Sequence, residues 1–77
     1  MIFRDAIRAL FAGAKVARRT WNGTRVLTTG VAINEKGTFI EVVYLVWTRS
    51  IDNGLREQYF PSHEDSHSSD WFVVIDS

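Results

Sequence analysis

The 77-residue chain contains no cysteine, so neither a disulfide nor a thiolate metal site can stabilise it. This absence is compatible with a reducing compartment. The longest apolar stretch covers only residues 42–47, which is far too short to cross a bilayer. Charges at Arg4, Asp5 and Arg8 also interrupt any secretory signal near the start of the sequence. We therefore expect one α+β domain over residues 1–77, in the cytoplasm and without membrane contact.

The chain also lacks a net charge, because nine basic side chains balance nine acidic ones. A domain that binds duplex DNA normally carries a basic surplus, since phosphate neutralisation supplies most non-specific affinity. We therefore expect no DNA partner. Four basic residues nevertheless gather between residues 15 and 25, whereas no Lys or Arg follows Arg56. The basic stretch at residues 15–25 suits a small anion. Equally, it could lie against the segment after Arg56, which carries only acidic charges, and the two could neutralise one another.

Near the start of the sequence, apolar residues recur at the spacing of one helix face. They are Phe3, Ala6, Ile7, Leu10 and Phe11. Gly13 follows as a left-handed terminator. The pattern predicts an amphipathic helix of about three turns whose apolar stripe covers a sheet.

The rest of the chain has the pattern of extended segments separated by turns. We expect strands at residues 15–18, 25–33, 38–49, 55–60 and 71–75. Turn-forming residues lie between them at 20–23, 34–37 and 52–54. Ser62 and Asp65 have the spacing of a weak capping box, which predicts a short helical or irregular piece before the last strand. The expected fold is an N-terminal helix packed on a small antiparallel sheet.

The strand expected at residues 38–49 is apolar on both of its faces. One helix of three turns covers only one side of a sheet, and a small antiparallel sheet in a monomer usually leaves its other side polar. Exposing either face would create a patch that soluble monomers avoid. We therefore expect a homo-oligomer that uses a sheet face, and symmetric packing of sheets is its simplest arrangement.

Residues 63–67 match the H-E-x-x-H pattern of zinc proteases. In that class both imidazoles must share one face of a long helix. Pro61 lies just upstream, and Ser66, Ser68 and Ser69 make a poor helix, so a polar helical turn with two solvated histidines is the favoured interpretation. The sequence also lacks a G-x-S-x-G elbow, a cysteine nucleophile and a P-loop. We expect no catalytic residue, no metal and no cofactor, and hence no enzyme.

Trp21 lies in the expected tight turn rather than on a periodic apolar face. Arg18, Arg19 and Asn22 place guanidinium and amide donors beside its ring. Recognition of a nucleotide needs these groups for stacking, phosphate binding and hydrogen bonding. A stack contributes about 1–3 kcal/mol, whereas nanomolar binding needs roughly 12 kcal/mol, so a second aromatic and a second subunit would have to help. From spacing alone, a Trp21 buried beneath the helix is an equal alternative.

Two motifs bracket nearly the whole chain. The first comprises Phe3-x-x-Ala6-Ile7-x-Ala9-Leu10-x-x-Gly13, then Lys15-Val16-Ala17-Arg18, then Trp21-Asn22-Gly23. The second is Pro61-Ser62-x-x-Asp65-x-x-x-x-Asp70-Trp71. In this order the motifs resemble the second Thoeris anti-defence family, which consists of small phage and prophage proteins. Each motif alone is weak, but together they are fairly specific.

The resemblance implies a phage anti-defence sponge that sequesters cyclic ADP-ribose isomers without cleaving them, so that the Thoeris effector is not activated. Some relatives also hold cyclic oligonucleotides from related systems such as CBASS in a separate pocket. The resemblance further implies a homotetramer with ligand pockets at subunit contacts, in the cytoplasm of the infected bacterium.

Carried over position by position, the motifs imply a ligand site. Trp21 and Trp71 are the stacking candidates, and Arg18 is a phosphate candidate. Asp65 or Asp70 would accept from ribose hydroxyls or pair with Arg18. The matching residues are Arg18, Trp21, Asn22, Asp65, Asp70 and Trp71.

The sequence departs from the family pattern in two places. Residues 66–69 replace an apolar, alanine-containing turn, and a compact turn at 52–54 stands where relatives often carry longer loops. Both departures bear on the identity of the ligand more than on the fold. The alternative function is a phage accessory module that uses an apolar sheet face to bind a host protein.

Overall fold

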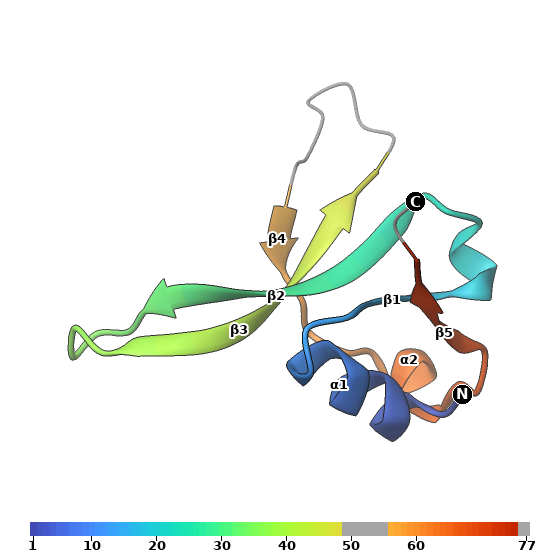
Figure 1. The fold of residues 1–77 in the computed structure, drawn as a ribbon, viewed down its shortest axis with the longest axis horizontal. Helices are drawn as coiled ribbons and strands as arrows, with labels where there is room; N and C mark the ends of the chain where they lie inside the picture. The colour runs from blue at the N-terminus through green and yellow to red at the C-terminus, as the bar shows by residue number, and fades with distance from the viewer. Residues whose placement is uncertain (49–55, 76–77) are drawn as a thin grey trace.

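The computed structural model describes residues 1–48 and 56–75 (Figure 1). A helix, α1 (Phe3–Phe11), precedes five strands of one antiparallel sheet, so the expected α+β class is confirmed. The strands are β1 (Lys15–Arg18), β2 (Arg25–Ile33), β3 (Phe39–Trp47), β4 (Arg56–Gln58) and β5 (Trp71–Val74). Two short helical segments, η1 (Arg19–Trp21) and α2 (His63–His67), connect strands. The turn expected at 52–54 lies outside the described residues.

The strand order β4-β3-β2-β1-β5 places the last strand at the sheet edge, next to the first. β1 and β5 pair antiparallel, with Arg18 opposite Trp71. β2 and β3 pair along their whole length and form the longest hairpin of the sheet (Figure 1). The two sequence motifs at opposite ends of the chain therefore meet where β1 ends.

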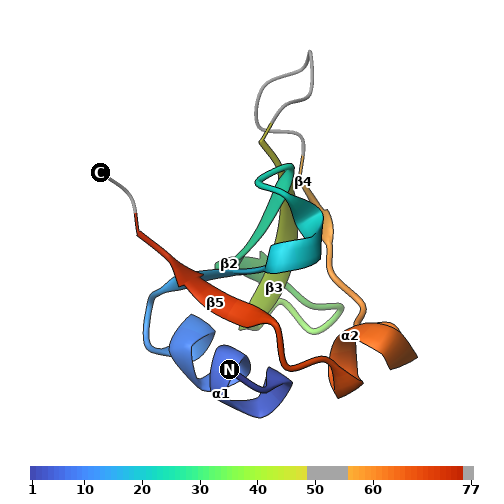
Figure 2. The ribbon, with the colours of Figure 1, turned by 90° about the vertical axis from the view of Figure 1, so that its right-hand side faces the viewer.

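The amphipathic helix α1 packs against β1, β2 and β5 (Figure 2). Ala6 and Leu10 lie one turn apart on its apolar stripe, and both are fully buried. Asp5 in the first turn interacts favourably with the helix dipole. Gly13 ends this segment with a φ of 102°, a conformation that glycine adopts without strain. Within residues 1–48 and 56–75, no helix is long and apolar enough to cross a membrane.

Two tryptophans lie in the hydrophobic core, and Trp71 contacts Phe3 of α1. Trp21 is 6% exposed and Trp71 is 1% exposed. Their ring centroids are 5.3 Å apart at an interplanar angle of 80°, an edge-to-face contact. The other buried apolar residues are Ala6, Leu10, Val16, Ala17, Leu27 and Leu45.

The far half of the β2–β3 hairpin projects beyond α1 (Figure 1). Val31, Ile33 and Phe39 share one face by register and alternation, and they are between 63% and 70% exposed. Ile40 is exposed on the opposite face. Both faces of this part of the hairpin thus present apolar side chains to solvent in a single chain.

Several element boundaries differ from the sequence predictions. Of the strand expected at 55–60, only β4 at residues 56–58 is formed in the described part, although the Tyr59 N–H still donates to the Val43 carbonyl oxygen over 2.9 Å. Pro61 has no N–H with which to extend the ladder further. The tight turn expected at 20–23 is a 3₁₀ turn followed by Asn22 and Gly23, both with positive φ. The strands expected to reach residues 49 and 75 end at 47 and 74.

Candidate functional site

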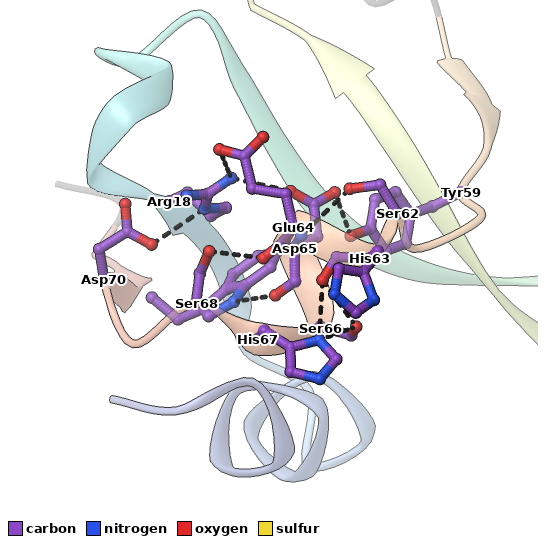
Figure 3. A network of polar contacts seen from close by, with 11 residues as sticks. Arg18, Tyr59, Ser62, His63, Glu64, Asp65, Ser66, His67, Ser68 and Asp70 are labelled. Carbon is purple, nitrogen blue, oxygen red and sulfur yellow. Dashed lines mark hydrogen bonds and ion pairs between the residues drawn. The ribbon is translucent and has the colours of Figure 1, made fainter.

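Arg18 is the centre of a charged network at the end of β1 (Figure 3). Its Nε donates to Asp70 Oδ1 over 2.9 Å, and its Nη1 donates to Asp65 Oδ1 over 2.9 Å. Glu64 Oε1 lies 3.4 Å from the same Nη1. The Arg18 side chain is only 8% exposed. The hydrogen bond with Asp70 raises the pKa of Arg18, although burial works in the opposite direction. The guanidinium is therefore a buried cation with three carboxylate partners.

Asp65 connects the network to three other segments. Its Oδ2 accepts from the Tyr59 hydroxyl over 2.8 Å, and its backbone carbonyl accepts from Trp71 Nε1 over 3.1 Å. Its backbone N–H donates to Ser62 Oγ, so the expected N-cap of α2 is present. Burial and the hydrogen bond to Asp65 raise the pKa of Tyr59. Both carboxylate oxygens of Asp65 are thus engaged within the fold.

Replacing Asp70 with asparagine should flatten the acid side of the stability profile. The Arg18 hydrogen bond holds the pKa of Asp70 below its ordinary value of 3.8. A carboxyl with a lowered folded pKa stabilises the fold above the unfolded pKa, and this contribution is lost as pH falls through the folded pKa. Urea unfolding of the wild type and Asp70→Asn between pH 7 and pH 2 measures the effect. Equal losses of unfolding free energy in both proteins on acidification would contradict it, and Asp5→Asn is the control.

The structure brings five of the six matching motif residues together and leaves the sixth apart. Arg18, Asp65 and Asp70 form the network, and Trp71 packs beside it and against Trp21. Asn22 is exposed in the left-handed conformation, with a φ of 51°. Their role in ligand binding stays a prediction.

Two hollows of about 490 Å³ each adjoin Trp21. Both are lined by Trp21, Arg25 and Asp65. The first also reaches residues 57–60, and the second reaches Arg18 and Glu64. Trp21 is therefore a core residue that also borders open space. These volumes lie within the range of small-molecule sites in proteins.

Arg25 is the residue of this region that the sequence motifs did not indicate. Its guanidinium carbon lies 5.0 Å from the ring centroids of both Trp21 and Trp47. The signal available in the sequence was its position two residues before Leu27, on the face of β2 that points into the core. A cation at that position must find partners within the fold or in a ligand.

The H-E-x-x-H segment forms α2, a helix of only five residues. Both imidazoles are exposed, and their ring centroids lie 4.1 Å apart. His67 Nδ1 contacts the His63 carbonyl oxygen over 2.9 Å. Among the described residues, no group of three or more His, Cys, Asp or Glu side chains could hold a metal ion.

Comparison with known families gives one match that covers nearly the whole chain. A family model for a Tad2-like domain, described as Thoeris anti-defense 2-like, matches residues 1–74. No curated protein matches the chain.

Proposed function

This chain belongs to the Thoeris anti-defence 2-like family and so has a role in Thoeris anti-defence, and we propose that it performs this role as a sponge. It would bind cyclic ADP-ribose signals in the cytoplasm of the infected bacterium and withhold them from the Thoeris effector. Cyclic oligonucleotides of CBASS systems are a second ligand class for the same mechanism.

The observation that carries this proposal is the pair of hollows around Trp21. An indole, a guanidinium and carboxylates border the same space, at Trp21, Arg25, Asp65 and Glu57. Stacking on a base, contact with a pyrophosphate and acceptance from ribose hydroxyls require these three kinds of group. A cyclic ADP-ribose molecule contains all three complementary parts.

The hydrogen bonds of Asp65 and Asp70 agree with retention of a ligand without its cleavage. Asp70 and Asp65 both accept hydrogen bonds from Arg18. The Arg18 hydrogen bond lowers the pKa of Asp70 and so favours its carboxylate form over the proton-donating form. These carboxylates are therefore better suited to holding the fold and the ligand than to general acid catalysis.

A retention assay on wild type and Trp21→Ala tests the sponge. Protein is incubated with a cyclic ADP-ribose isomer, filtered and heated, and we expect the wild type to release intact ligand. Loss of one stack should raise the Kd roughly 5- to 150-fold in Trp21→Ala. Trp21→Phe keeps apolar volume in the core, and Phe11→Ala removes an exposed aromatic ring outside the hollows. Release of an altered nucleotide, or equal retention by all four proteins, would contradict the proposal.

We also propose that the working form is a homo-oligomer, a tetramer as the family resemblance implies. The exposed apolar residues of the β2–β3 hairpin support self-association, since soluble monomers avoid such surfaces. Light scattering at micromolar concentration should give a mass several times that of one chain, and Phe39→Ser with Ile33→Ser should lower it. A monomeric wild type would overturn the oligomer.

The same hairpin favours the alternative function, a phage accessory module that binds a host protein. In that case the wild type would retain no cyclic nucleotide and would form a stable complex with another protein through Val31, Ile33 and Phe39. Retention of intact ligand by the wild type decides for the sponge.

A further inference from the structure

Arg25 begins β2 directly opposite Trp47, the last residue of β3. Its guanidinium lies over the indoles of Trp21 and Trp47, at 5.0 Å from each centroid. Three segments that are separate in sequence, η1, β2 and β3, thus converge on one cation. A guanidinium that packs its face on aromatic rings keeps its in-plane N–H donors for other partners.

Among residues 1–48 and 56–75, one of those donors, Arg25 Nε, has no acceptor. Arg25 Nε is buried without a hydrogen-bond partner, and no carboxylate of the described residues lies within salt-bridge distance of Arg25. Arg18 differs in this respect, because it has three carboxylate partners. Buried polar groups in native proteins are nearly always satisfied, so an orphaned donor needs an explanation. A missing ligand supplies one.

Arg25 also borders both hollows beside Trp21. A ligand in either hollow can therefore reach it, whereas Arg18 is committed to Asp65 and Asp70. Glu57 lines the first hollow as well, so an anion placed there must overcome a like charge. Removing the Glu57 charge should strengthen anion binding. This variant should therefore change the affinity in the opposite direction to a variant that removes the Arg25 charge.

We infer that Arg25, rather than Arg18, is the phosphate-binding residue of this site. It donates in-plane N–H groups to the anionic oxygens of a nucleotide pyrophosphate, while the base or sugar of the ligand lies against Trp21. The inference rests on the proposed function for the identity of the ligand. Its physical basis, an unsatisfied arginine beside an indole in a hollow, does not depend on that function.

Calorimetric titration of Arg25→Gln with cyclic ADP-ribose and with adenosine tests the inference. Loss of charged hydrogen bonds should weaken cyclic ADP-ribose binding about 10- to 100-fold, whereas adenosine, which has no phosphate, should change less than about twofold. Arg56→Gln is the matched control, because Arg56 also lies over an aromatic ring, 5.4 Å from the Tyr44 centroid, but outside both hollows. Arg25→Lys keeps the charge and should give an intermediate loss, and thermal unfolding checks the fold of each variant.

Titration with inorganic pyrophosphate separates failure of this inference from failure of the sponge. If the wild type holds no cyclic ADP-ribose, the proposal of a cyclic ADP-ribose sponge is wrong. A saturable change in tryptophan fluorescence with pyrophosphate that is lost in Arg25→Gln still supports phosphate binding by Arg25. Glu57→Gln should tighten this binding. Equal cyclic ADP-ribose affinity in wild type and Arg25→Gln would contradict phosphate binding by Arg25, while the proposal of a sponge would stand. No wild-type response to either probe overturns both.

Discussion

Replacing Trp71 with alanine should lower the free energy of unfolding by about 3–5 kcal/mol, as for other buried tryptophans. The indole is 1% exposed and contacts Phe3 and Trp21, at ring-centroid distances of 5.5 and 5.3 Å. A chain of this length has a total stability of roughly 4–12 kcal/mol. The loss is therefore a large fraction of the total stability, and the variant should unfold at a much lower urea concentration than the wild type. Urea unfolding followed by circular dichroism measures the loss.

One further variant tests the hydrogen bond of the Trp71 indole, and a second is a control at an exposed ring. Trp71→Phe keeps an aromatic ring but removes the Nε1–H that donates to the Asp65 carbonyl, and should lose about 1–2 kcal/mol for that bond. Phe60→Ala removes an exposed ring and should change stability by less than about 0.5 kcal/mol. A Trp71→Ala protein as stable as Phe60→Ala would mean that the indole does not lie in the core.

Replacing Arg18 with methionine should cost about 1–3 kcal/mol, because it leaves Asp65 without its charged hydrogen-bond partner, whereas the 78% exposed Glu64 stays hydrated. The side chains of Arg18 and Asp65 are 8% and 15% exposed, so solvent screens their attraction only weakly. The loss should appear at neutral pH in urea unfolding of the same kind. This large structural effect also explains why ligand assays on Arg18 variants need a folding check.

A double-mutant cycle identifies the source of that loss. Asp65→Asn combined with Arg18→Met should recover part of the lost stability, with a coupling energy of about 0.5–3 kcal/mol. Arg56→Met removes an exposed arginine and should have little effect. Strictly additive losses for Arg18→Met and Asp65→Asn would show that the two side chains do not interact.

Local patterns were sufficient to predict most of the elements. α1 follows from the period of its apolar stripe and from Gly13, and the β2–β3 hairpin follows from two long apolar runs around a turn. The limits of β4 were not predictable in this way. The run of apolar and polar residues at 55–60 has strand character, but the point at which its pairing with β3 stops is set by the tertiary fold.

The sequence motifs predicted most of the residues of the candidate site but not how these residues contact one another. The motif residues Arg18, Asp65 and Asp70 do meet, but 47 and 52 positions separate Arg18 from the two acids, and single-sequence periodicity carries no information at that range. The sequence analysis included Arg25 in the basic stretch at residues 15–25 but could not distinguish it from its basic neighbours, for a related reason. Its lack of an acceptor depends on where every nearby carboxylate lies in space.

The pairing of β1 with β5 also bears on how the protein forms during synthesis. The β2–β3 hairpin joins neighbouring segments and can assemble as soon as both have left the ribosome. Val16 pairs with Val73 and Arg18 pairs with Trp71, so β1 lacks its partner on that side until residues 71–74 have been synthesised. A ribosome-bound chain that ends before residue 71 therefore exposes the surface of β1 and α1 that Trp71 later covers. We expect the sheet to be completed only after residues 71–74 have left the ribosome.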